Sequence, residues 1–267
     1  AMGFDSGNFT PSSTYDDTGT MILNGKTIGN YDRKARGITS MQQLLSQSLN
    51  IGAATIALKV GSTTMSDYFS KYGFGEKTGI DLPDEATGMI RNLKSGREID
   101  VATAAYGQGI SVSPIEMVRA LSILANGGYL IKPHLVKEID SVLGGVSKTT
   151  LERNGPILKK QTTIDVTKML IEIVDTALKH GDIKMDRYTI AAKTGTAQIA
   201  DRINGGYYPD RYLHSFFGYF PAYNPRFLIF LYQVYPKGAQ YASETLTNPF
   251  DNLTKFLINY YNIPPDR

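Results

Sequence analysis

The sequence predicts an α+β fold in which a mainly helical part precedes a sheet and a closing helix. Capped helical patterns fall before residue 180, β-rich apolar runs follow between 188 and 235, and a helical pattern returns at the C-terminus. Because helices and strands are segregated along the chain, alternating βαβ units are not expected. We predict one domain over residues 1–267, divided into the following segments. These are a loop-rich entry segment at 1–38, a mainly helical part at 39–180, and a sheet hairpin with a C-terminal helix at 181–267.

Composition excludes several classes of function. The 267 residues are 42% hydrophobic and 20% charged, which suits a chain that buries a core. Lys plus Arg is 28 against 25 for Asp plus Glu, and no basic stripe argues for nucleic acid. The chain has no cysteine, and its three histidines show no metal-ligand spacing. We therefore expect no metal site.

The entry segment and the helices are predicted from turn residues and caps. Residues 1–38 are rich in Gly, Ser, Thr, Asn and Asp, so we expect loop with one short hairpin over 20–28. Thr39 with Gln42 forms a predicted capping box for the first helix. Further helices are expected at 51–60 (ended by Gly61), at 65–71, from Pro114 to Leu124 after the cap Ser113, at 161–179, and at 248–261. Residues 144–160 are weakly patterned.

The predicted sheet comes from three β-rich runs near the C-terminus. Two of them, 213–222 and 226–235, are joined by Tyr223-Asn224-Pro225. A tight turn of this kind predicts an antiparallel hairpin. The third run, 188–198, precedes them in the chain.

The strongest motif lies inside that third strand as Lys193-Thr194-Gly195-Thr196. Glycine within a strand marks the close approach of a ligand or another backbone. A fixed cation beside two hydroxyl donors suits a carboxylate. The triplet Lys77-Thr78-Gly79 repeats the same letters in a predicted loop, and we expect Lys77 to be a solvated turn residue.

A second, weaker pattern is Ser48-x-Asn50, in a predicted turn between two helices. Such a turn can hold a hydroxyl and an amide rigidly toward a cleft. Asn50 also fits the N-cap of the following helix, and Ser6-Gly7-Asn8 matches the same pattern. Position, rather than the letters alone, favours a functional turn.

Together these residues resemble the transpeptidase domain of class B penicillin-binding proteins, from about Thr14 to the C-terminal helix. The most specific stretches are Tyr72 to Pro83, Ala104 to Gly109 followed by Ser113-Pro114, Ala125-Asn126-Gly127-Gly128, and Ala192 to Gln198. The resemblance implies a penicillin-binding/serine β-lactamase-like fold, with an antiparallel sheet flanked by helices and a helical subdomain across a cleft. It also implies peptidoglycan D,D-transpeptidation by serine acyl transfer in the intact parent, a reaction that needs no metal or organic cofactor.

The resemblance assigns roles to the two motifs. Ser48 would relay a proton to the leaving amine, and Asn50 would hold the substrate amide. Lys193, Thr194 and Thr196 would bind the terminal carboxylate along the strand that contains Gly195, and the Thr196 backbone N–H would form half of an oxyanion hole. The loops at 74–83 and 106–109 would shape the cleft without chemistry. The segment 207–209 either overhangs the cleft or is a surface loop between strands, and the second reading is favoured.

One feature departs from the family. Its nucleophile is a serine in Ser-x-x-Lys, and no serine in this chain has lysine three residues later. The nearest imitation, Thr176 to Lys179, begins with threonine and falls after Ser48 instead of before it. We therefore expect no nucleophile in this chain. The resemblance places the serine segment and a membrane anchor upstream of Ala1.

Three readings remain open from the sequence. The first is part of an active transpeptidase at the outer face of the bacterial cytoplasmic membrane. Its ligands would be peptidoglycan stem peptides and, in the parent, β-lactams; its partners would be a lipid-linked glycan polymerase and division or elongation proteins. The second is a serine-less relative that binds peptidoglycan or a partner. The third is a serine β-lactamase or β-lactam sensor.

Overall fold

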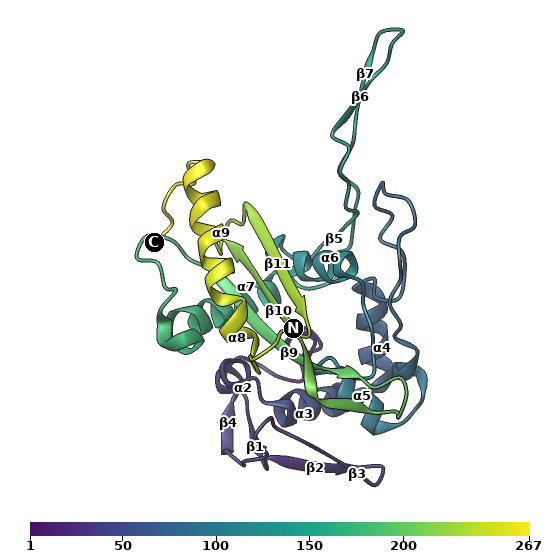
Figure 1. Cartoon of the computed structure of the whole chain (residues 1–267), viewed down its shortest axis with the longest axis vertical. Coiled ribbons are helices and arrows are strands. Elements are labelled where there is room, and N and C mark those ends of the chain that lie inside the picture. Colours follow the sequence, from purple (N-terminus) through teal and green to yellow (C-terminus); the bar gives the residue numbers. More distant parts are fainter.

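The computed structural model describes residues 1–267 and has the predicted α+β class (Figure 1). The α-helices are α1 Met2–Asp5, α2 Met41–Gln47, α3 Asn50–Val60, α4 Ser62–Lys71, α5 Glu98–Ala104, α6 Pro114–Ala125, α7 Lys160–Glu172, α8 Ala242–Thr245 and α9 Thr247–Tyr260. The strands are β1 Thr14–Asp17, β2 Thr20–Leu23, β3 Lys26–Gly29, β4 Gly37–Ser40, β5 Leu130–Ile131, β6 Glu138–Asp140, β7 Val146–Lys148, β8 Arg153–Asn154, β9 Ala191–Ala200, β10 Tyr207–Phe220 and β11 Phe227–Val234. None of the helices combines the length and the apolarity that crossing a bilayer requires.

The central sheet has the strand order β11-β10-β9 and is antiparallel throughout. The predicted hairpin is confirmed, since Phe220 pairs with Phe227 across the turn between β10 and β11. Helix α9 packs on one side of the sheet, where the Phe250 ring stacks on Phe216 at 4.3 Å. Helix α7 packs against β9, and the largest apolar core lies among these elements. Strand β9 is therefore held firmly at one edge of the sheet.

The entry segment is more ordered than the sequence predicted. The hairpin expected over 20–28 is present as β2 and β3. The expectation of loop elsewhere was wrong, because β1 pairs with β4 and a short helix α1 precedes them. The capping box was misplaced by one residue: Ser40 caps α2 with Gln43, while Thr39 is buried within β4. A strand that runs directly into a helix gives no loop signal in the sequence.

The helical part follows the prediction with local differences. Helix α3 ends at Gly61 as expected, and the Ser113–Glu116 capping box starts α6. Helix α4 begins at Ser62 instead of Met65, and α5 was not predicted. The helix expected to reach Lys179 loses α-helical form after Glu172, passing through a π turn at 173–177 and a 3₁₀ turn at 178–181. Positive φ at Lys179 completes this break.

A long hairpin that includes part of the weakly patterned residues 144–160 projects from the body of the protein (Figure 1). Strands β6 and β7 pair within it, and β5 pairs with β8 at its base. The carboxylate of Asp81 accepts hydrogen bonds from the backbone N–H groups of Leu135 and Val136, at 2.7 and 2.8 Å. The loop at 74–83 therefore fixes the direction in which the hairpin leaves.

Candidate functional site

The predicted Ser48-x-Asn50 turn joins α2 to α3. Ser48 adopts the left-handed conformation, with φ 54° and ψ 51°, which ends α2. Leu49 is buried beneath the turn, and the Ser48 side chain is exposed. A buried apolar residue between two polar ones holds the Ser48 hydroxyl at the surface in a fixed place.

Asn50 does not cap α3, so that alternative was wrong. The N-cap is Leu49, and Asn50 is the first residue of the helix. The Asn50 side-chain amide donates a hydrogen bond to the Gly29 carbonyl oxygen at 2.9 Å. A carboxamide has two N–H donors and a carbonyl oxygen, so this bond leaves one donor and the acceptor for a ligand.

Lys193 on β9 reaches the Ser48 turn. Its ammonium donates to the Ser48 hydroxyl oxygen at 2.5 Å and to the Thr194 carbonyl oxygen at 2.9 Å. No carboxylate forms an ion pair with it. Burial lowers the pKa of Lys193 from 10.5 to about 8, because desolvation disfavours the charged form. The structure thus brings the two predicted motifs into direct contact across 145 positions of sequence.

The two threonines of the motif differ in their partners. The Thr196 hydroxyl oxygen accepts a hydrogen bond from the Ala242 backbone N–H at 2.9 Å. The Thr194 hydroxyl makes no hydrogen bond within the chain and is partly exposed. Both hydroxyls therefore keep their own proton for a ligand, as carboxylate recognition requires.

Gly195 is required by its neighbour on β10. A Cβ at this position would lie 2.6 Å from the Ser215 hydroxyl oxygen, and that hydroxyl donates to the Gly195 carbonyl at 3.4 Å. The sequence analysis attributed this glycine to the approach of a ligand or another backbone, whereas the close neighbour within the chain is the Ser215 side chain. The sequence analysis did not single out Ser215, and its alternation within an apolar strand gives only a weak signal.

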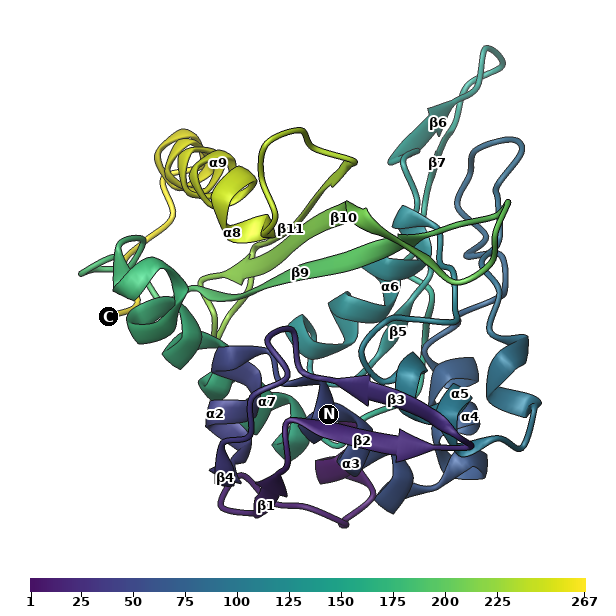
Figure 2. The same cartoon turned by 60° about the horizontal axis from the view of Figure 1, so that its bottom comes forward.

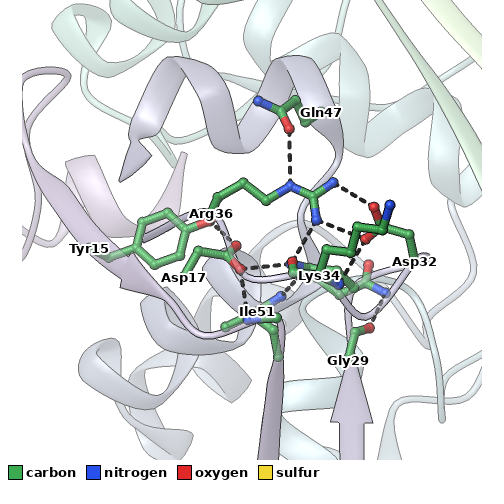
Figure 3. A network of polar contacts seen from close by, with 11 residues as sticks. Tyr15, Asp17, Gly29, Asp32, Lys34, Arg36, Gln47 and Ile51 are labelled. Atoms are coloured by element: carbon green, nitrogen blue, oxygen red, sulfur yellow. Dashed lines mark hydrogen bonds and ion pairs between the residues drawn. The ribbon is translucent and has the colours of Figure 1, made fainter. Parts of the chain in front are cut away.

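A buried polar network holds the start of α3, which follows the Ser48 turn in the chain (Figure 3). The fully buried Asp17 carboxylate accepts hydrogen bonds from the Tyr15 hydroxyl, the Gly19 N–H and the Asn30 amide, at 2.8, 2.9 and 2.8 Å. The oxygen of the Asn30 side-chain amide in turn accepts a hydrogen bond from the Ile51 N–H at 3.1 Å. Burial, reinforced by the hydrogen bond to Asp17, raises the pKa of Tyr15 above its ordinary value. The start of α3 is thus tied to a carboxylate that cannot easily lose its partners.

The loop between β3 and β4 carries an ion pair that also touches α2. Arg36 donates two hydrogen bonds to the Asp32 carboxylate, at 2.8 and 2.9 Å. It donates another to the oxygen of the Gln47 side-chain amide at 3.3 Å. Hydrogen bonding from Arg36 lowers the pKa of Asp32 to about 2. This bidentate geometry fixes the loop beside the Ser48 turn.

The predicted shaping loop at 106–109 meets the sheet near the end of β9. The Gly109 N–H donates to the Tyr207 hydroxyl at 2.7 Å. The Gln108 side-chain amide donates to the side-chain oxygen of Gln198 at 3.4 Å. Tyr207 and Tyr208 lie at the start of β10, so the loop favoured for 207–209 was wrong. A second bridge therefore joins the helical part to the sheet.

A cavity of about 490 Å³ lies apart from the residues of the two motifs. It is lined by the start of β10 and by residues 235–240, which lead into α8, and none of the two motifs' residues lines it. The motif residues instead form an open wall along the edge of β9, where Ser48 and Thr196 are exposed. In Figure 2, β9 is the strand of the central sheet that runs nearest to α2 and α3. An ammonium and two free hydroxyl donors can together bind a carboxylate that ends an extended chain.

Comparisons with known proteins identify the family of this chain. The profile of the penicillin binding protein transpeptidase domain matches residues 1–255. Stage V sporulation protein D of Bacillus subtilis is 32% identical over 87% of this chain, which spans 36% of that protein. Peptidoglycan D,D-transpeptidase FtsI of Buchnera aphidicola is 26% identical over 84% of this chain, which spans 37% of it. The chain thus covers well under half of each of these relatives.

Solved structures establish the fold. Penicillin-binding protein 3 of Mycobacterium tuberculosis, in complex with aztreonam, superposes with a TM-score of 0.87 at 24% identity, covering 100% of this chain and 61% of its own. The transpeptidase domain of penicillin-binding protein 3 from Burkholderia pseudomallei gives 0.83 at 24% identity, covering 100% and 77%.

Proposed function

Because the chain belongs to the penicillin-binding protein transpeptidase domain family, we propose that it forms the carboxylate-binding wall of a peptidoglycan D,D-transpeptidase. The substrate would be a stem peptide ending in D-Ala-D-Ala. The observation that carries this proposal is the contact between the Lys193 ammonium and the Ser48 hydroxyl, at 2.5 Å. It unites the only two polar motifs that the sequence marked for chemistry.

Each residue has a role that suits its surroundings. The terminal carboxylate would accept hydrogen bonds from the Thr194 and Thr196 hydroxyls, near the Lys193 charge. Asn50 would hold the substrate amide with the donor and acceptor that Gly29 leaves free. The Thr196 backbone N–H would serve an oxyanion, and Gly195 would keep the strand edge clear.

Lys193 and Ser48 would act together in proton transfer. A pKa of about 8 places the Lys193 ammonium close to neutral pH, where it can both give and regain a proton. Ser48 accepts from the ammonium and keeps its own hydroxyl proton, so it can pass one to a leaving amine. This relay serves acyl transfer to a serine that the 267-residue chain does not supply in a Ser-x-x-Lys motif.

The cellular setting follows from the same proposal. A D,D-transpeptidase works on the cell wall, so the domain would lie at the outer face of the bacterial cytoplasmic membrane. Stem peptides would be its ligands, and β-lactams would inhibit a protein that combines this wall with a Ser-x-x-Lys serine. A lipid-linked glycan polymerase and division or elongation proteins would be its partners.

Two measurements test the proposal. An N-acylated peptide ending in D-Ala-D-Ala should bind this chain more tightly than the same peptide as a C-terminal amide, measured by NMR titration. Equal binding of the two, or none, would contradict a carboxylate-binding wall.

The second measurement concerns the nucleophile. The chain should form no covalent adduct with a fluorescent penicillin, whereas the protein encoded by the full reading frame of its gene should be acylated and should lose the label slowly. A mass increase of one opened β-lactam on the 267-residue chain would reveal an unrecognised nucleophile. Rapid turnover by the full protein would favour a β-lactamase.

A further inference from the structure

The segment that begins α8 touches the proposed carboxylate site. Ala242, the first residue of α8, is fully buried, and its backbone N–H donates to the Thr196 hydroxyl oxygen at 2.9 Å. The helix belongs to a part of the chain that sequence reasoning did not assign to the site.

This contact decides what the Thr196 hydroxyl can do. A threonine hydroxyl has one proton and two lone pairs, and its proton rotates to suit its surroundings. With the Ala242 N–H occupying one lone pair, the proton must point away from α8. Thr196 is exposed, so that proton is available to a ligand on the wall. A hydroxyl that already accepts one hydrogen bond is also polarised into a better donor.

Several contacts hold the Ala242 N–H in place. The buried His214 ring pairs through its two nitrogens with the Thr245 hydroxyl at 2.8 Å and the Gln240 carbonyl at 3.0 Å. His214 lies opposite Thr196 in the register of β10 and β9. The ring of Tyr241 meets the Tyr31 ring edge-on at 6.3 Å, which ties α8 to the loop beside the Ser48 turn.

We propose that the Ala242 backbone N–H is a positioning group of the carboxylate site, which sets the Thr196 hydroxyl as a donor toward the ligand. The proposal rests on the proposed function and names a group that adds to the preference of this site for an acid over a neutral chain end. The contact between the Tyr31 and Tyr241 rings helps to hold the start of α8 in the position that this role requires.

The substitution Ala242→Pro removes this one donor with little other change. Proline is well tolerated at the first position of a helix. Tyr241, which would precede the proline, already has the extended conformation that this requires, with φ −115° and ψ 143°. The conservative variant Ala242→Gly keeps the N–H.

The probes are an N-acylated D-Ala-D-Ala peptide and its C-terminal amide, each titrated by NMR. In Ala242→Pro the affinity for the acid should fall about three- to tenfold while that for the amide stays the same, since one oriented hydrogen bond to a charge is weakened. Ala242→Gly should retain the acid-to-amide ratio. An unchanged ratio in Ala242→Pro, or an equal loss for both peptides, would overturn the proposal.

A measurement on the unaltered chain keeps the proposal testable if the proline variant does not fold. The Ala242 amide proton should shift downfield when the acid binds and stay in place when the amide binds, because the hydroxyl becomes a stronger acceptor as it donates to a carboxylate. No shift with a saturating acid would overturn the positioning role. If the unaltered chain binds acid and amide equally, the proposed function itself fails.

Discussion

The chain carries Lys-Thr-Gly twice, and the two copies have different surroundings. Lys193-Thr194-Gly195 lies in β9, where the lysine is partly buried and contacts Ser48. Lys77-Thr78-Gly79 lies in a loop, where Lys77 is exposed, as the sequence predicted. Identical letters therefore give one desolvated cation next to a hydroxyl and one solvated cation.

The threonines and glycines of the two copies are also used differently. Thr194 has a free hydroxyl, whereas the Thr78 hydroxyl and N–H both donate to Glu85, at 2.5 and 2.7 Å. Partial burial disfavours the charged form of Glu85, but these hydrogen bonds outweigh it and lower its pKa. Gly195 makes room for Ser215, whereas Gly79 has φ +76°. The loop copy uses its groups to hold itself together, and the strand copy leaves them for a ligand.

Among these substitutions, replacing the two lysines should give the largest difference between the two Lys-Thr-Gly copies, measured as affinity for the acid. Lys193→Met keeps the aliphatic length but removes the charge, so affinity for the D-Ala-D-Ala acid should fall about 10- to 100-fold, the usual value of a hydrogen bond to a charged group. Lys77→Met is the matched control and should leave the affinity unchanged. NMR titration measures both, and a loss in Lys77→Met as large as in Lys193→Met would break the comparison.

Replacing Thr78 should mainly lower the stability of the fold, whereas replacing Thr194 should mainly weaken acid binding. Thr78→Val removes a hydroxyl donor from Glu85 and should lower the free energy of unfolding by about 1–2 kcal/mol. Thr194→Val should lower stability by less than about 0.5 kcal/mol and weaken acid binding about threefold or more. Urea unfolding and NMR titration give the two numbers. A stability loss in Thr194→Val equal to that in Thr78→Val would show that its hydroxyl has a structural partner.

Replacing the glycines should reveal two different causes of the same requirement. Gly79→Ala places a Cβ on a left-handed residue and should cost about 1 kcal/mol of stability, which no second substitution relieves. Gly195→Ala should cost about as much through the clash with the Ser215 hydroxyl. Adding Ser215→Ala should then recover most of the loss, measured by urea unfolding. Failure of this rescue would place the constraint in the backbone of β9.

The sequence was sufficient to predict features that depend on residues close to one another in the chain. The β10–β11 hairpin, the α6 capping box and the loop position of Lys77 depend on residues close in sequence, and all three were predicted. The Ala242 contact with Thr196 was not, because it joins residues 46 positions apart through a backbone N–H that every residue type carries. The Asn50–Gly29 hydrogen bond was not predicted for the same reason, because Gly29 comes from a different part of the chain.

The pH dependence of the unfolding free energy should also distinguish Lys193 from Lys77. Burial lowers the folded-state pKa of Lys193 to about 8, while the ordinary value of 10.5 applies to the unfolded chain. Between these values the unfolded chain binds a proton that the folded chain has released, so the Lys193 contribution to stability should rise with pH. One proton sets a ceiling of about 1.4 kcal/mol per pH unit, and the partial exposure of Lys193 keeps the slope below it.

The difference in unfolding free energy between the unaltered chain and Lys193→Met isolates this contribution, because the other titrating groups occur in both. It should be flat below pH 8, rise between about pH 8 and 10.5, and level off above. The difference taken with Lys77→Met should stay flat throughout. Lys193→Met should therefore be at least as stable as the unaltered chain at pH 7 although it binds the acid poorly, since the chain holds a desolvated ammonium at a cost to folding. A difference that falls between pH 8 and 10.5 would mean that Lys193 has an anionic partner in the folded chain, which would make it a structural residue like those of the loop copy.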